Sequence, residues 1–139
     1  METLNFSQYT LLEQLTIGDD CFENVDLFNI DGLNHLKSLK IGRKSFTRQK
    51  GDWNWNKANN RNRSFSILNC NELKSIEIGR FSFFDYGGKF ELKNLPSLSI
   101  IKIGSIETDY SESNNNGWSL NFWYSSFEIK GIIECNDID

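Results

Sequence analysis

The amino-acid sequence predicts a β-rich solenoid, a right-handed coil of repeated units with parallel strands and little helix. A ten-residue pattern, Leu-x-x-Leu-x-x-(Leu/Ile)-x-Ile-Gly, recurs four times, at 9–18, 33–42, 70–79 and 95–104. A shorter piece, Phe-x-(Ile/Leu), begins 13 residues before the last Ile of three copies, at Phe28, Phe65 and Phe90. Apolar side chains at such fixed offsets are buried together only when each unit stacks on its neighbours.

Each ten-residue pattern ends in a short run that alternates apolar and polar residues, as in Leu39-Lys40-Ile41. That period of two predicts a strand with one buried and one solvated face. Successive units run in the same direction, so neighbouring strands are expected to pair in parallel on a concave wall. The Phe-x-(Ile/Leu) pieces predict short second strands on the opposite, convex wall.

Two kinds of residue follow each predicted strand. A glycine comes first, and we expect it to allow a sharp backbone turn; these glycines are Gly18, Gly42, Gly79 and Gly104. A small residue and a phenylalanine come next in three units, as Cys21-Phe22, Ser45-Phe46 and Ser82-Phe83. We interpret this phenylalanine as an inward plug at the turn.

The totals fit a single domain, 1–139, of about four and a half repeats. Apolar residues make up 38% and charged residues 24%, which is not the composition of a disordered chain. No stretch approaches the roughly 18 apolar residues of a membrane helix, and the first residues lack the segments of a secretory signal. These features predict an intracellular, cytoplasmic protein without membrane contact.

The three cysteines, Cys21, Cys70 and Cys135, are far apart and fall at inward positions of the repeat. We interpret them as buried, reduced thiols of an intracellular protein. Their spacing lacks the clustering that a zinc site needs. Neither a metal nor another cofactor is therefore expected.

The segment 70–78, CNELKSIEI, followed by Ser82-Phe83, resembles the BspA-like subclass of leucine-rich repeat proteins. The resemblance runs from residue 4 to about 135, and it implies a solenoid that often binds partners on its concave side. Common leucine-rich repeats also carry an asparagine ladder, whose usual positions hold other residues here: Asp20, Lys44, Phe81 and Glu107. Asn69 and Asn94, just before the repeat core, are candidates to replace it.

A long loop at about 47–64 lies in the most basic part of the chain. Between 37 and 63, nine basic residues face one acid, Asp52, a balance of +8 in a chain of net charge −4. The basic residues are Lys37, Lys40, Arg43, Lys44, Arg48, Lys50, Lys57, Arg61 and Arg63. With Trp53 and Trp55 between them, the 43–63 segment is a candidate contact for an acidic protein, or alternatively for a polyanion or nucleic acid. The remaining interpretation is a solvated loop whose tryptophans fold back over the convex face.

A second long loop, at about 105–126, ends in an aromatic cluster of Trp118, Phe122, Trp123 and Tyr124. Exposed aromatic rings on a rigid frame are typical of sugar-binding platforms and protein hot spots. Glycan binding is therefore an alternative function. The other interpretation is that these rings pack against the preceding repeat.

The solvated face of the main sheet is the third candidate surface. Its first row is Thr16, Lys40, Glu77 and Lys102, and its second row is Gln14, Ser38, Ser75 and Ile100. With strands about 4.8 Å apart, Lys40, Glu77 and Lys102 form an alternating charge ladder. The ladder is either a surface that keeps the protein soluble or a recognition surface, and both interpretations stand.

Nothing in the sequence indicates catalysis. The single histidine, His35, occupies an outward position, and no Ser or Cys has an acid or base at a nucleophile-like spacing. Gly87-Gly88 lacks the Lys-Ser/Thr of a phosphate loop and is interpreted as a turn. The expected function is a non-catalytic protein–protein interaction module, and nucleic acid is a less favoured partner.

The predicted stack has no evident cap at either end. Its apolar end residues are Phe6, Tyr9 and Leu11 at one end and Ile132, Ile133 and Ile138 at the other. Uncapped ends of repeat proteins expose apolar surface and strand edges. They act as makeshift caps, continue into a longer protein, or associate end to end with a second copy.

Overall fold

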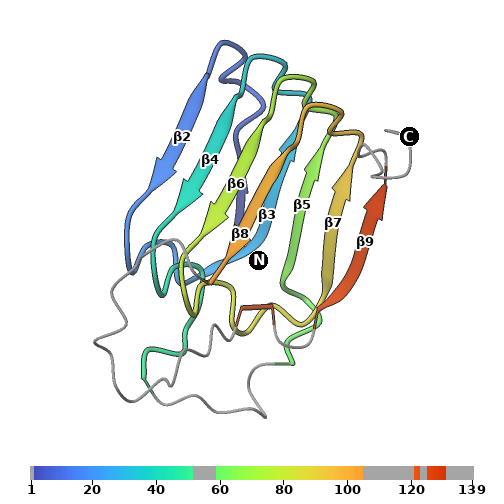
Figure 1. The fold of residues 1–139 in the computed structure, drawn as a ribbon. Helices are drawn as coiled ribbons and strands as arrows, with labels where there is room; N and C mark the ends of the chain where they lie inside the picture. The colour runs from blue at the N-terminus through green and yellow to red at the C-terminus, as the bar shows by residue number, and fades with distance from the viewer. Residues whose placement is uncertain (1, 52–58, 105–120, 123–124, 131–139) are drawn as a thin grey trace.

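The computed structural model describes residues 2–51, 59–104, 121–122 and 125–130 (Figure 1). Within these ranges the chain forms nine strands and no helix. The strands are β1 (Glu2–Asn5), β2 (Gln14–Ile17), β3 (Val25–Asp31), β4 (Ser38–Ile41), β5 (Ser64–Leu68), β6 (Ser75–Ile78), β7 (Lys89–Lys93), β8 (Ile100–Ile103) and β9 (Ser126–Lys130). The part of the chain described here contains no helix that could cross a bilayer.

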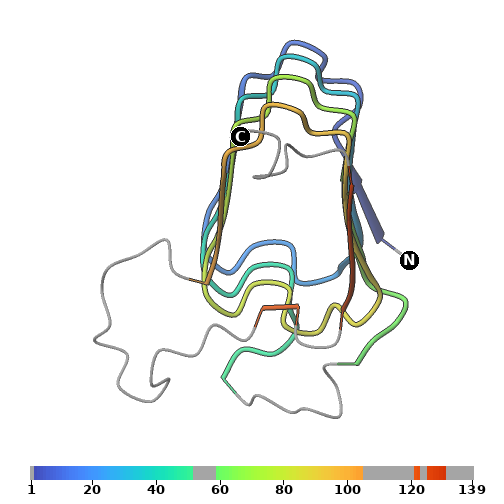
Figure 2. The ribbon, with the colours of Figure 1, turned by 45° about the vertical axis from the view of Figure 1, so that its right-hand side comes forward.

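The chain alternates between two sheets. One sheet has the order β1-β3-β5-β7-β9 and the other the order β2-β4-β6-β8. Every pair of neighbouring strands is parallel. Each turn of the chain therefore adds one strand to each sheet, beside the strand of the turn before it. The successive turns overlie one another in Figure 2. The β-rich, parallel part of the predicted fold is confirmed.

The strand register follows the predicted repeat. In the four-stranded sheet, Thr16 pairs with Lys40, Lys40 with Glu77, and Glu77 with Lys102. In the other sheet, one column holds an aromatic residue on four strands: Phe28, Phe65, Phe90 and Phe127. The strands predicted from the Phe-x-(Ile/Leu) pieces were expected to be short. Instead they form the larger of the two sheets and include the longest strand, β3.

Two columns of phenylalanine rings form the centre of the core between the sheets. The column along the five-stranded sheet is Phe28, Phe65, Phe90 and Phe127, and the column along the turns is Phe22, Phe46, Phe83 and Phe122. Neighbouring centroids within a column lie 4.6–5.4 Å apart. The columns meet edge to face, as between Phe65 and Phe83 at 5.0 Å. Phe46 and Phe83 are fully buried, so their predicted role as inward plugs is confirmed. The same prediction was wrong for Phe22, which is 46% exposed at the end of its column.

The glycines that end the strands are needed for close approach between turns. A Cβ on Gly42 would lie 2.8 Å from the carbonyl carbon of Gly18, and one on Gly79 would lie 2.5 Å from that of Gly42. Neither Gly42 nor Gly79 has a positive φ, so a special backbone conformation was the wrong reason for these two glycines. Gly104 does have a positive φ, of 84°.

The small residue before each turn phenylalanine links successive turns. The Ser45 hydroxyl donates to the Gly18 carbonyl at 2.7 Å and accepts from the Cys21 N–H at 3.1 Å. Ser82 makes the equivalent bonds one turn further along. In the next turn Asn121 takes this place, since its side-chain amide donates to the Gly79 and Ser82 carbonyls, at 2.7 and 2.9 Å. Buried backbone groups at the turns are thus satisfied from neighbouring turns.

A second polar ladder crosses the carboxyl ends of β3, β5 and β7. The Asn94 side-chain amide donates to Asn69 Oδ1 at 3.0 Å, and the Asn69 amide donates to Asp31 Oδ1 at 2.9 Å. Both asparagines have left-handed φ values, 55° and 56°, a region that Asn tolerates better than most residues. The expectation that Asn69 and Asn94 supply a ladder is confirmed.

The cysteines differ in burial. Cys70 is fully buried, and burial raises the pKa of its thiol. Cys21 is only partly buried and its thiol lies 3.3 Å from the Asp19 carbonyl oxygen, so the prediction of a buried thiol was wrong for Cys21. Both thiols are free. Cys135 lies outside the described residues.

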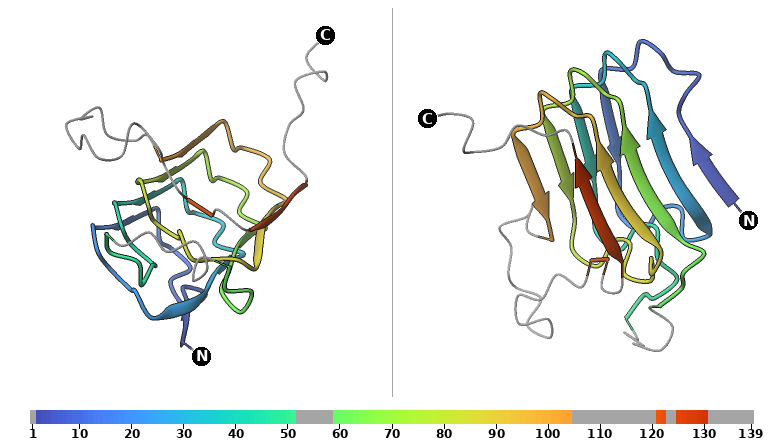
Figure 3. Two further views of the ribbon diagram at one scale, coloured as in Figure 1. Left: turned by 90° about the horizontal axis from the view of Figure 1, so that it is seen from below. Right: turned by 90° about the vertical axis from the view of Figure 1, so that its right-hand side faces the viewer.

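The two ends of the stack expose side chains that are buried in the middle. At the first turn Leu11 is 76% exposed and Tyr9 is also exposed. At the other end, Ile101 on β8 and Phe127 on β9 occupy inward columns yet are exposed, because among the described residues no strand follows β8 or β9 in its sheet (Figure 3). End-to-end association remains a prediction, and Ile132, Ile133 and Ile138 lie outside the described residues.

Replacing Phe83 by Ala should reduce the free energy of unfolding by about 3–5 kcal/mol, because it opens a cavity between both ring columns. Phe22→Ala is the matched control, since Phe22 has nearly the same φ, 58° against 60°, but is 46% exposed at the end of its column. Its loss should be much smaller. Urea denaturation measures both variants, and equal losses would contradict a core centred on the two columns.

Candidate functional site

The outer face of the four-stranded sheet carries side chains that have no partner within the described residues. Lys102 Nζ lies 3.9 Å from Glu77 Oε1, so this part of the predicted ladder is present. The Lys40 side chain, beside Glu77 in the register, makes no ion pair or hydrogen bond within the described part of the chain. Ile100, on the same face, is 45% exposed. The face therefore offers both a free cation and an apolar contact.

On the outer face of the five-stranded sheet, every Lys and Glu side chain of β7 and β9 is in an ion pair. Glu91 Oε2 lies 3.0 Å from both Lys89 Nζ and Lys93 Nζ. Glu128 Oε1 lies 3.0 Å from Lys93 Nζ and 3.3 Å from Lys130 Nζ. Hydrogen bonds from Lys93 and Lys130 hold the pKa of Glu128 at about 2. Sequence reasoning did not identify this network, although the alternation of Lys and Glu in 89–93 and 128–130 is visible.

Much of the basic segment is paired with the acidic first turns. The first 36 residues contain seven Asp or Glu and no Lys or Arg. Lys50 Nζ lies 3.4 Å from Asp20 Oδ1, and Arg48 Nη2 lies 3.5 Å from Asp26 Oδ1. The charge asymmetry of the sequence is thus partly cancelled between neighbouring turns.

Two further basic residues of this segment are half-buried. The Arg43 backbone N–H donates to Asp19 Oδ1 at 2.7 Å. The Lys44 ammonium lies 5.9 Å from the centre of the Phe81 ring, within the range of a cation–π contact. Trp53, Trp55 and Lys57 lie outside the described residues.

Arg63 is a core residue. Its side chain is 0% exposed, its Nε lies 3.1 Å from Asp26 Oδ1, and its Nη1 lies 2.8 Å from Asp85 Oδ2. Its Nη2 donates to the Val25 carbonyl at 2.9 Å, and its guanidinium lies 4.9 Å from the centre of the Tyr86 ring. The expectation of Arg63 as a partner contact is therefore corrected. Two carboxylates and a ring hold it inside, because a buried guanidinium requires compensation.

Arg63→Gln should reduce the free energy of unfolding by about 3–5 kcal/mol, because it leaves the buried Asp85 carboxylate without a cation and Asp26 with only its Arg48 ion pair. Adding Asp85→Asn should recover part of that loss. Arg61→Gln, the same exchange at an exposed position two residues away, should change stability by less than about 0.5 kcal/mol. Denaturant unfolding of the three variants measures this, and similar losses for Arg63→Gln and Arg61→Gln would refute the buried network.

Phe122 also belongs to the core. It is 2% exposed and stacks on Phe83 at 4.8 Å, as the last ring of the turn column. The expectation of Phe122 as an exposed binding ring is therefore corrected, because its apolar ring fills the column. Trp118, Trp123 and Tyr124 lie outside the described residues.

The described residues do not bring together a metal-binding group of His, Cys, Asp or Glu side chains. His35 is exposed, as expected, and its Nδ1 lies 3.7 Å from Glu72 Oε2. Gly87 and Gly88 form the close turn before β7, where added Cβ atoms would lie 2.7 Å from the Asn60 nitrogen and 2.4 Å from Ser64 Oγ. Here the glycines allow two segments to touch.

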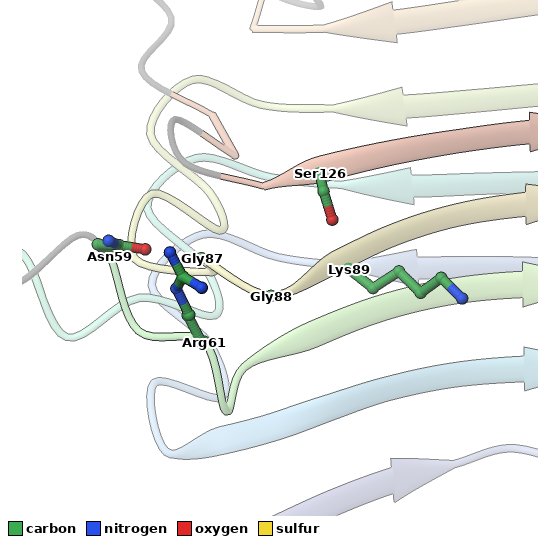
Figure 4. Close-up of a pocket in the computed structure, with 6 residues that line it drawn as sticks. All are labelled: Asn59, Arg61, Gly87, Gly88, Lys89 and Ser126. Atoms are coloured by element: carbon green, nitrogen blue, oxygen red, sulfur yellow. The ribbon is translucent and has the colours of Figure 1, made fainter.

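A pocket of about 380 Å³ opens beside this glycine turn (Figure 4). Its lining residues are Asn59, Arg61, Gly87, Gly88, Lys89 and Ser126. They come from three separate parts of the sequence, which is why no local motif predicts the pocket. Arg61 was singled out from the sequence for its charge alone.

The described residues define an all-β protein. They form two parallel sheets with polar outer faces and contain no helix. No protein-family model, curated protein or solved structure matches this chain.

Lowering the pH should remove the stabilising contribution of the Glu128 network. The folded pKa of Glu128, about 2, lies below the unfolded value of about 4.3. The contribution is therefore fully present above the unfolded value and is lost as the pH falls through the folded value. Glu128→Gln should flatten the pH dependence of stability in this window, and NMR titration should place the folded Glu128 near pH 2.

High salt is the control for that experiment, because the network is solvent-exposed and its ion pairs are screened. At about 1 M salt the Glu128 titration should move toward the unfolded value. A titration that already lies near about 4.3 at low salt would show that the ion pairs do not form.

Proposed function

We propose that the chain is a leucine-rich repeat solenoid, right-handed and most like the BspA-like subclass, and that it serves as a non-catalytic protein-binding module. The alternation between two parallel sheets, with one column position per turn, supports the solenoid. The asparagine ladder through Asn69 and Asn94 adds support for the leucine-rich repeat type. A cytoplasmic location belongs to the same proposal and is supported by the free thiols of Cys21 and Cys70.

The difference between the two outer faces carries the functional proposal. On β7 and β9, Lys and Glu side chains satisfy one another. On the four-stranded sheet Lys40 has no partner among the described residues, and Ile100 is exposed beside the Glu77–Lys102 pair. A rigid sheet that presents a free cation, an ion pair and an apolar side chain suits recognition of a protein surface with acidic groups.

The two alternatives have less support from the described residues. For polyanion or nucleic-acid binding through 43–63, Arg63 is not accessible because its side chain is buried in the core. Arg48 and Lys50 already have acidic partners. Glycan binding through 118–124 loses Phe122 to the ring column. Neither alternative gains a specific contact that favours it.

Reversing the charges of Lys40 and Lys102 to Glu should abolish capture of the protein partner from native lysate. Lys130→Glu is the control, because Lys130 also stands on the last strand of a sheet and also pairs with one glutamate, Glu128 at 3.3 Å. Quantitative mass spectrometry of nuclease-treated captures should find proteins retained by the control and lost from the double variant. Equal retention by both would exclude the four-stranded face.

Salt distinguishes the alternatives in the same experiment. Binding that uses several phosphate contacts weakens by orders of magnitude between about 50 and 200 mM salt. Capture that disappears at the higher salt together with co-purified nucleic acid would favour the polyanion alternative. Capture that persists supports a protein partner.

A further inference from the structure

The pocket beside the glycine turn contains an uncompensated cation. Arg61 is exposed, and its guanidinium makes no ion pair or hydrogen bond with the rest of the described chain. Lys89 also lines the pocket, but its Nζ lies 3.0 Å from Glu91 Oε2 and 3.6 Å from Glu128 Oε2. In Figure 4 the Lys89 side chain runs along β7, away from Arg61. The pocket therefore has one free positive charge.

The turn that carries Arg61 is held rigidly. The Arg63 N–H closes it by donating to the Asn60 carbonyl at 3.2 Å. The Gly87 and Gly88 N–H groups donate to the Asn60 and Arg63 carbonyls, each at 2.9 Å. Arg63 is anchored in the core, so the backbone that carries Arg61 is fixed. Binding of a ligand would therefore cost little conformational entropy at this turn.

The remaining polar groups of the pocket are side-chain donors. The backbone N–H groups of the glycine turn and its neighbours are already used: besides Gly87 and Gly88, Lys89 N–H donates to Ser64 Oγ and Ser126 N–H donates to the Gly88 carbonyl, both at 3.1 Å. The Asn59 amide and the Ser126 hydroxyl have no protein partner among the described residues, and both line the pocket. Figure 4 places Asn59 beside Arg61 and Ser126 across the Gly87–Gly88 backbone from them.

We propose that this pocket binds a carboxylate, supplied by an acidic side chain or the chain terminus of a protein partner. A guanidinium presents paired N–H donors that match a carboxylate, with bidentate geometry. One free positive charge balances one carboxylate, whereas a phosphate dianion would remain half-compensated. The proposal rests on the proposed function and names a chemical feature of the partner.

The test is an NMR titration of the full chain with a capped Gly-Ser-Glu-Ser-Gly peptide and its Gln counterpart. The Glu peptide should shift the Arg61 Nε–H and the Ser126 and Gly88 amides saturably, and the Gln peptide should not. Arg61→Gln should weaken binding at least about tenfold, the scale of one charge-assisted hydrogen-bonding group. Lys74→Gln, which also removes an exposed, unpaired cation but lies outside the pocket, should leave the affinity unchanged.

Equal weakening by Arg61→Gln and Lys74→Gln, or equal binding of the Gln peptide, would overturn the site. Inorganic phosphate binding more tightly than the Glu peptide would overturn the carboxylate assignment. Sodium acetate binding as tightly as the peptide would overturn a protein source while leaving a carboxylate site. The titration measures binding at Arg61 directly. A negative titration would therefore not change the result of the lysate capture through the Lys40 face. A negative lysate capture would likewise leave the titration interpretable.

Discussion

The structure depends on the stacking of one phenylalanine on the next between turns. Rings 4.6–5.4 Å apart match the spacing of paired strands, so a ring column and a strand ladder reinforce each other. A turn displaced by one residue would move its phenylalanine out of the column and its alternating residues onto the wrong face. The parallel register and the rows on both outer faces therefore follow from the ring columns, as does the close contact of Gly18, Gly42 and Gly79.

The same stacking explains how a chain with strongly segregated charge folds compactly. The acidic first turns and the basic segment are neighbours along the stack, so Asp20 meets Lys50 and Asp26 meets Arg48. Arg63 extends this pairing into the interior, where Asp26 and Asp85 compensate it and Tyr86 covers it. Charge that the composition suggested as a surface for partners is thereby partly used to join turns.

The repeat was predictable because local offsets repeat without change, and strand positions, register and plug residues such as Phe46 follow from them. Phe122 was misjudged because the long segment before it conceals the repeat: Asn121-Phe122 stands where Ser45-Phe46 and Ser82-Phe83 stand, with Asn replacing Ser. That substitution was the available signal. The sequence contains no comparable signal for Arg63, because no local pattern indicates that a basic residue in a polar loop is buried against Asp85. The pocket at Arg61 depends on three distant segments and needs coordinates.

Charge pairing is so general in the described chain that its exceptions are informative. Lys37, Arg48, Lys50, Arg63, Lys89, Lys93, Lys102 and Lys130 all lie within ion-pair distance of an acid. A surface pair contributes only about 0–1 kcal/mol, so pairing mainly determines which charges stay available for others. Lys74 is also unpaired, but it precedes β6 and lies outside the pocket. Lys40 stays available on a flat sheet beside an exposed isoleucine, and Arg61 stays available in a pocket on a fixed turn. Both positions combine a free cation with a rigid support, and that combination favours recognition of an acidic partner over a surface that only maintains solubility.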